Sequence, residues 1–119
     1  MVTTDQIKDV NERIELLKSY LEIDKKLIEI ANEEEKASDP DFWNNPKQAE
    51  LLMRSLRGKK KWVTDYERLK ADGEDLMVMY DFYKEEEASE QEVQALFDKT
   101  LDLLESLEFK NMLSEEGDN

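Results

Sequence analysis

Apolar residues recur every seven positions in the first third of the chain, as they do in a helix that packs along a seam. The two interleaved sets are Ile7, Ile14, Leu21 and Ile28 with Val10, Leu17 and Ala31. Asp24 takes the one position of this pattern that is polar. Thr3 and Gln6 have the spacing of a capping box, in which each side chain satisfies a backbone donor of the first turn. The pattern predicts a helix from about Thr4 to Glu35.

A second apolar stripe lies beside the first on the same predicted helix. Its members are Leu16, Tyr20, Ile23, Leu27 and Ile30. Two adjacent apolar stripes indicate that the later half of the helix packs against more than one neighbour. This arrangement is typical of a bundle rather than of an isolated two-stranded coil.

The segment SDPDFWNNP, residues 38–46, interrupts the helical pattern. We refer to Pro40, Phe42, Trp43, Asn45 and Pro46 as the aromatic turn. Proline disfavours the helical conformation in the residue before it, so one helix must end before this turn and the next must begin after it. Asn45 suits the N-cap and Pro46 the first helical position. We expect both rings to fold back over the end of the bundle, because exposing such a ring forfeits about 1.5 to 3 kcal/mol. A ligand platform is the alternative, but no convergent polar groups accompany the rings.

A second helix is predicted from Pro46 to about Ala71. Its apolar face consists of Ala49, Leu52, Leu56, Val63 and Tyr66, flanked by Trp62 and Leu69. We expect Gly73 to end this helix and a shorter one to cover about Glu74 to Glu86. Alternatively, the two helices merge through Gly73 into one bent rod.

The last helix is predicted from about Glu90 to Met112 and opens with a second capping box, Ser89 and Glu92. Its apolar face consists of Val93, Leu96, Phe97, Thr100, Leu103, Leu104 and Leu107. Residues 1–113 are therefore expected to form one helical domain, and residues 114–119 an acidic frayed tail or the start of a linker. The predicted fold class is all-α, an antiparallel bundle of three to four helices with coiled-coil-like packing.

Composition excludes most kinds of catalytic site. The chain has 119 residues and no Cys or His, which removes disulfides, thiolate nucleophiles, Cys/His zinc sites and the usual general base. Its 31 carboxylates have no spacing that suggests an acid/base pair, and there is no glycine-rich phosphate loop. We expect no enzyme activity, no metal and no cofactor. The N-terminus lacks a signal peptide, and no apolar run could span a membrane, so we expect a cytoplasmic protein.

The net charge of −14 disfavours direct contact with nucleic acid unless cations are locally concentrated. One such concentration exists on the second predicted helix, where cations share an arc of about 80° opposite the apolar face. We call this set the basic stripe: Lys47, Arg54, Arg57, Lys61 and Arg68.

The basic stripe has two interpretations. It is either a solvated face with local pairs such as Glu50 with Arg54 and Lys61 with Asp65, or a docking surface. A docking surface, helped by Lys59 and Lys60, would take an acidic partner or one stretch of RNA backbone.

Taken together, the motifs resemble the N-terminal helical domain of bacterial peptide chain release factor 2, in the class I release factor family. The resemblance covers essentially the whole chain. It rests on the stretch from Asp39 to Pro46, on Leu107-Glu108-Phe109 in the last helix, and on the segment from Tyr20 to Asp24.

The resemblance implies a part in translation termination. Members of that family recognise UGA and UAA stop codons through a serine-proline-phenylalanine tripeptide and trigger peptidyl-tRNA hydrolysis through a glycine-glycine-glutamine loop. Neither motif occurs here. We therefore expect a release factor truncated before its codon-recognition and catalytic domains, with a stand-alone paralogue as the alternative.

The resemblance also implies partners. In the family, this domain projects toward the stalk base of the large ribosomal subunit and the surface visited by the class II release factor GTPase, and it does no chemistry. We further expect the isolated chain to form a homodimer through its seam. The alternative function is a free-standing helical adaptor that binds another protein.

Overall fold

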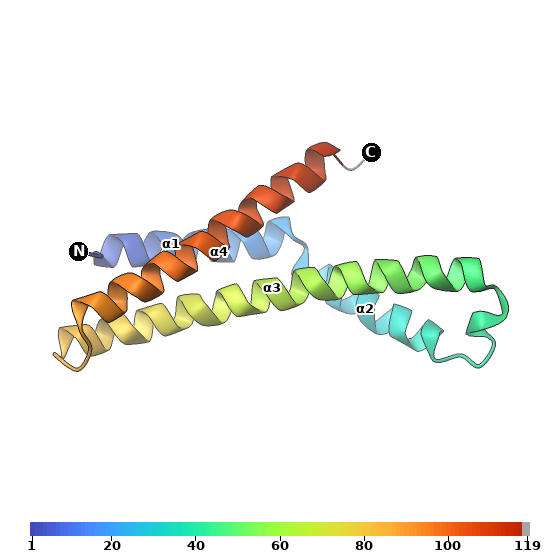
Figure 1. Ribbon diagram of the computed structural model, residues 1–119, viewed down its shortest axis with the longest axis horizontal. Coiled ribbons are helices and arrows are strands. Elements are labelled where there is room, and N and C mark those ends of the chain that lie inside the picture. Colours follow the sequence, from blue (N-terminus) through green and yellow to red (C-terminus); the bar gives the residue numbers. More distant parts are fainter. Residues whose placement is uncertain (118–119) are drawn as a thin grey trace. The chain divides into compact units, whose positions relative to one another are not determined.

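The computed structural model describes residues 1–117, and within them it contains helices and no strand (Figure 1). The elements are α1 (Thr4–Tyr20), α2 (Ile23–Ala37), the short 3-10 helix η1 (Phe42–Asn44), α3 (Pro46–Lys84) and α4 (Glu90–Gly117). The predicted fold class, an all-α antiparallel bundle, is confirmed. α4 continues to Gly117, beyond the predicted end at Met112.

The chain divides into two compact units. The terminal unit comprises Met1–Leu21 and Tyr66–Asn119, and the hairpin unit comprises Glu22–Asp65.

The prediction of one helix from Thr4 to Glu35 is wrong, because the helix breaks between α1 and α2. Glu22 adopts a left-handed conformation with φ 52° and ψ 51°. Leu21 and Ile23 on either side of it are both buried, with 2% and 3% of their surface exposed. In an unbroken helix these two side chains would point about 200° apart, so one packing surface could not cover both. The break allows both to be buried.

In the terminal unit, α1 and α4 lie side by side with the C-terminal half of α3 (Figure 1). Its core is the predicted seam of α1 with one face each of α3 and α4. The most deeply buried large side chains are those of Val10, Leu17, Leu21, Leu69, Leu76, Val93, Thr100, Leu104 and Leu107. Both predicted capping boxes are present, Thr3 with Gln6 and Ser89 with Glu92.

Gly73 does not end a helix but lies buried within α3, so the alternative of one merged helix is confirmed. A Cβ atom on Gly73 would lie 2.7 Å from both Asn11 Oδ1 and Ile14 Cδ1 of α1. The Asn11 side-chain amide donates to the carbonyls of Ile7, at 3.1 Å, and Gly73, at 3.3 Å. Glycine at this position therefore lets α1 approach the α3 backbone.

The hairpin unit consists of α2, the aromatic turn and the first half of α3. Ile23, Ala49, Leu56 and Val63 are its buried apolar residues. The predicted second stripe packs only in part: Ile23 is buried and Ile30 half-buried, but Leu16, Tyr20 and Leu27 are 54%, 63% and 48% exposed. The first seam also ends early, since Ile28 is 64% exposed.

Candidate interaction surface

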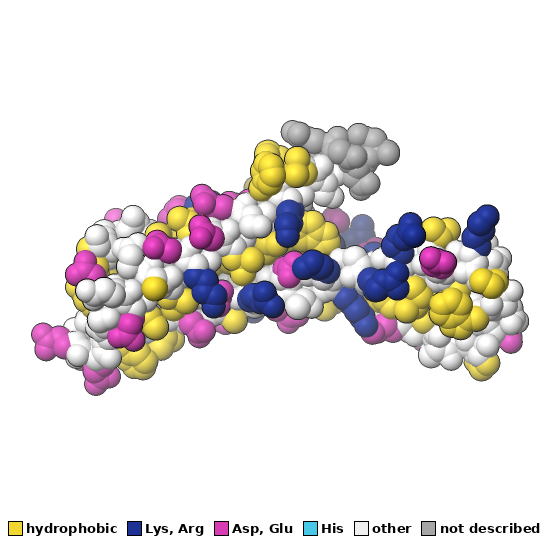
Figure 2. All heavy atoms as spheres, viewed as in Figure 1, with side chains coloured by type: hydrophobic (Ala, Val, Ile, Leu, Met, Phe, Trp, Pro, Cys, Tyr) yellow, Lys and Arg dark blue, Asp and Glu magenta, His cyan; other side chains and the backbone are white. Residues whose placement is uncertain are grey.

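The basic stripe lies on the outer face of α3, as predicted. Lys47, Arg54, Arg57 and Lys61 are exposed on the hairpin unit, and Arg68 is exposed on the terminal unit. Figure 2 shows Lys and Arg side chains projecting along the N-terminal half of α3, with apolar side chains beside them. The stripe on the hairpin unit is therefore accessible to a partner.

Most cations of the basic stripe have no ion pair within residues 1–117. Lys61 pairs with Asp65 at 3.0 Å, as predicted, but within residues 1–117 the expected pair of Glu50 with Arg54 does not form. In the same described range, Lys47 and Arg57 also have no ion pair. Within residues 1–117, the interpretation as a face with local ion pairs therefore holds only at Lys61.

Lys59 and Lys60, unlike most cations of the stripe, form ion pairs within the hairpin unit. Lys59 contacts Glu33 and lies 3.5 Å from Glu29, and Lys60 pairs with Glu34, all on α2. The hydrogen bond with Glu33 raises the pKa of Lys59 above its ordinary value. These contacts hold α2 against α3. The two lysines are therefore distinct from the exposed cations of the basic stripe.

The aromatic turn reverses the chain as predicted. The Asp39 side chain accepts from the backbone N–H of Asp41 at 2.8 Å, and η1 follows. Asn45 caps α3, since its side-chain oxygen accepts from the N–H of Gln48 at 3.3 Å, and Pro46 is the first helical residue.

The expectation that both rings cover the end of the bundle is wrong for Trp43. Its side chain is 58% exposed, and Phe42 is only half-buried. The two rings pack edge to face, with centroids 5.2 Å apart. Each ring therefore covers part of the other, while most of the Trp43 side chain faces solvent.

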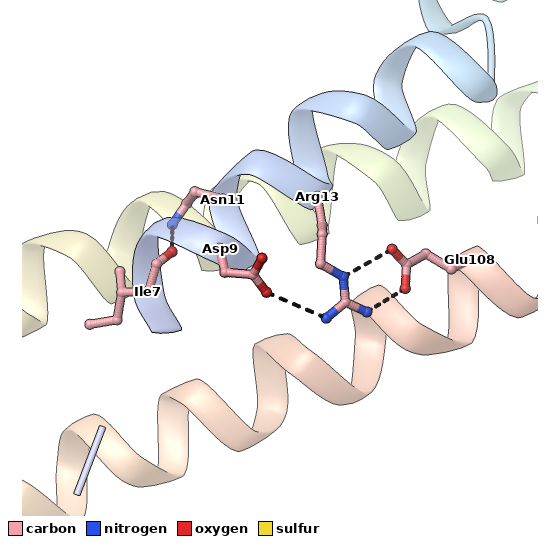
Figure 3. A network of polar contacts seen from close by, with 5 residues as sticks. All are labelled: Ile7, Asp9, Asn11, Arg13 and Glu108. Carbon is pink, nitrogen blue, oxygen red and sulfur yellow. Dashed lines mark hydrogen bonds and ion pairs between the residues drawn. The ribbon is translucent and has the colours of Figure 1, made fainter. Parts of the chain in front are cut away.

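The motif Leu107-Glu108-Phe109 fastens α4 to α1 in the terminal unit. Leu107 is buried, and the Glu108 carboxylate accepts from Nη2 and Nε of Arg13, at 2.6 and 3.2 Å (Figure 3). Asp9 lies 3.9 Å from the same guanidinium. The hydrogen bond with Glu108 raises the pKa of Arg13 above its ordinary value. Phe109, in contrast, is 55% exposed.

A groove of about 550 Å³ also lies on the terminal unit. Ile7 of α1 and Met77 and Tyr80 of α3 line it, and Lys8, Glu12, Asp81 and Lys84 are among its charged neighbours. Sequence reasoning did not find this groove, because it depends on how α1 lies against α3.

Within residues 1–117, no group of His, Cys, Asp and Glu side chains could hold a metal ion. None of the helices in that range has an apolar stretch that could cross a membrane. The surface features described above are exposed charges and exposed apolar side chains. The fold and the surface thus define an all-helical protein with an exposed cationic face on α3 and an apolar groove on the terminal unit.

Comparison with known proteins identifies the family. The PCRF domain family matches residues 26–119, so this chain belongs to that family. The match includes the aromatic turn, the basic stripe and the Leu107-Glu108-Phe109 motif, and it confirms the resemblance found in the sequence.

Curated relatives are named peptide chain release factor 2. The protein of Acidovorax sp. (strain JS42) is 32% identical over 94% of this chain and 31% of its own length. The proteins of Colwellia psychrerythraea and Streptomyces avermitilis are 33% and 26% identical, over 95% and 98% of this chain and 32% of their own lengths. The chain thus spans about a third of the length of these relatives. No solved structure matches it significantly.

Proposed function

We propose that this chain is an accessory, non-catalytic domain of a peptide chain release factor that terminates translation at UGA and UAA stop codons. The observation that carries the proposal is the similarity of nearly the whole chain to proteins named peptide chain release factor 2. Residues 1–113 are the proposed helical domain. A protein that acts on ribosomes in this way would be located in the cytoplasm.

The proposed mechanism is positioning. The domain contacts the large ribosomal subunit near its stalk base and the class II release factor GTPase, while codon reading and hydrolysis belong to other parts of a release factor. The physical support is the surface itself, which combines exposed unpaired cations on α3 with an apolar groove on the terminal unit. Such surfaces recognise partners through charge and apolar burial.

A chimera tests the proposal. Residues 1–119 would replace the matching segment in the release factor 2 of a relative, and a second variant would lack that segment. Peptide release from purified ribosomes stalled at UGA, UAA and UAG is then measured. We expect the chimera to release peptide at UGA and UAA, and the deletion to be slower or to recycle poorly while still hydrolysing at those codons. Complete loss of hydrolysis in the deletion would contradict an accessory role.

A free-standing helical adaptor is the second candidate function, and the apolar groove beside Ile7, Met77 and Tyr80 is the observation in its favour. An adaptor would bind its partner without ribosomes. The chimera distinguishes the two functions, because a domain built only as an adaptor would leave the chimera no more active than the deletion.

A further inference from the structure

Gly58 lies on the exposed surface of α3 at the edge of the basic stripe. It is four residues after Arg54 and three before Lys61, so these two side chains border it on one side, and Arg57 lies farther round the helix on that same side. It is exposed, and a Cβ atom built on it meets no other atom within 4 Å. Nothing in the described chain therefore requires glycine at this position.

Glycine is unfavourable in the interior of an α-helix, and α3 extends far beyond Gly58 on both sides. The contrast with Gly73 is informative, because there the side chains of α1 fill the space that a Cβ would take. An exposed helical glycine without such a neighbour leaves the backbone open to close approach from outside the chain.

The charges beside Gly58 indicate what kind of partner approaches the α3 backbone there. Lys47, Arg54 and Arg57 are exposed and, within residues 1–117, form no ion pair, although the chain carries a net charge of −14. With Lys61 they line one side of α3 over about 21 Å. Two of them are arginines, whose planar forks bind phosphate oxygens in pairs. Leu51, 61% exposed, adds apolar surface at the edge.

We propose that this face of α3 binds an RNA phosphate backbone, which lies against Gly58 and is held by Lys47, Arg54, Arg57 and Lys61. The choice of RNA over an acidic protein rests on the proposed function, because the ribosomal surface offers phosphate backbones. Backbone contacts of this kind position a protein without reading sequence. The face thus serves as a docking point for the domain.

Binding of the purified chain to a labelled RNA hairpin of mixed sequence tests the proposal, with polyglutamate as the competing acidic polymer. Contact with about four phosphates predicts that the logarithm of the binding constant falls by about 3 for each tenfold rise in salt. We expect Arg54→Glu with Arg57→Glu to weaken binding at least about tenfold. Lys70→Glu is the matched control, since Lys70 is exposed on another face of α3 and has no ion pair within residues 1–117.

Gly58→Leu separates binding from folding. The substitution adds a helix-favouring side chain in open space, so the thermal midpoint should not fall, yet the side chain would hold the RNA away from the backbone. Weaker RNA binding by a fully folded Gly58→Leu chain supports the proposal.

Three results would overturn the proposal. The Gly58→Leu variant could bind RNA as tightly as the parent chain, Lys70→Glu could weaken RNA binding as much as the arginine substitutions do, or the chain could bind polyglutamate in preference to RNA. The last would assign an acidic protein to this face. If the chimera releases peptide but the chain does not bind RNA, only this inference is contradicted. If the chain binds RNA but the chimera is inactive, the proposed function is contradicted.

Discussion

Arg13 of α1 holds Glu108 of α4 through two parallel hydrogen bonds, and Glu108 belongs to one of the motifs by which the sequence resembles release factors. This motif therefore has a structural role in the terminal unit. The side chains are 32% and 35% exposed, so solvent screens the pair but does not eliminate it.

A double-mutant cycle measures this contact. Arg13→Ala, Glu108→Ala and the double variant should give a coupling energy of about 1 kcal/mol in urea unfolding, because paired hydrogen bonds strengthen an otherwise half-exposed ion pair. Asp9→Ala is the control and should change stability little, since Asp9 is 3.9 Å from Arg13. Additive effects of the two substitutions would mean that the pair is not formed in solution.

Gly73 and Gly58 should respond oppositely to alanine. Gly73→Ala forces a Cβ against Asn11 and the buried Ile14, so we expect a loss of about 1 to 2 kcal/mol even after the gain in helix propensity. Gly58→Ala meets open space and should gain up to about 1 kcal/mol. Thermal unfolding followed by circular dichroism compares the two variants, and the same sign of change in both would refute the close approach of α1 to α3.

Trp43→Ala should cost less than about 1 kcal/mol, because most of the ring is already in water. Leu104→Ala, at a fully buried position of α4, should cost about 2 to 5 kcal/mol. Chemical denaturation gives both values. A loss from Trp43→Ala as large as that from Leu104→Ala would show that the ring is buried in solution.

Lys59 should contribute more to the stability of the fold than its neighbour Lys60. Lys59→Met leaves the largely buried Glu33 carboxylate without its partner, at a cost of about 1 to 3 kcal/mol. Lys60→Met removes a half-exposed pair and should cost under about 1 kcal/mol. Combining Lys59→Met with Glu33→Met should restore much of the loss in denaturant unfolding. No recovery in the double variant would argue against the pair as the cause.

The cap of α4 should weaken in acid. The backbone N–H of Ser89 donates to the Glu92 carboxylate at 3.0 Å and lowers the pKa of Glu92. Because the folded-state pKa lies below the unfolded value of about 4.3, the charged group stabilises the fold above that pH. This stability is lost as the pH falls through the folded-state pKa.

Glu92→Gln keeps an acceptor oxygen but not the charge. The parent chain should therefore be more stable than this variant at neutral pH, and the difference should disappear as the pH falls through the folded-state pKa of Glu92. Thermal unfolding across that range tests the prediction. A difference independent of pH would assign the effect to packing instead of charge.

Local signals in the sequence were sufficient for much of the fold. Both capping boxes, the N-cap at Asn45 and the outward direction of the basic stripe follow from spacing alone, because each depends on neighbours within one or two turns. The family resemblance likewise rested on short motifs.

Features that depend on distant parts of the chain were missed. No glycine or proline marks the break at Glu22, and the one available signal was the polar Asp24 in the seam. Gly73 looked like a helix end because its role depends on Asn11 and Ile14, which are far away in the sequence. The size of Trp43 predicts burial, but Phe42 covers only part of the ring and 58% of the side chain stays exposed.

Crosslinking from α3 tests the central claim most directly, namely that this domain positions a release factor through contact with the ribosome. A photoreactive residue replaces Leu51, which is exposed beside the stripe, in the chimera bound to ribosomes at a UGA codon. The same residue at Lys70 serves as the control. We predict a crosslink from position 51 to RNA of the large subunit and little from position 70; crosslinks only to the small subunit, or none above the control, would contradict the account.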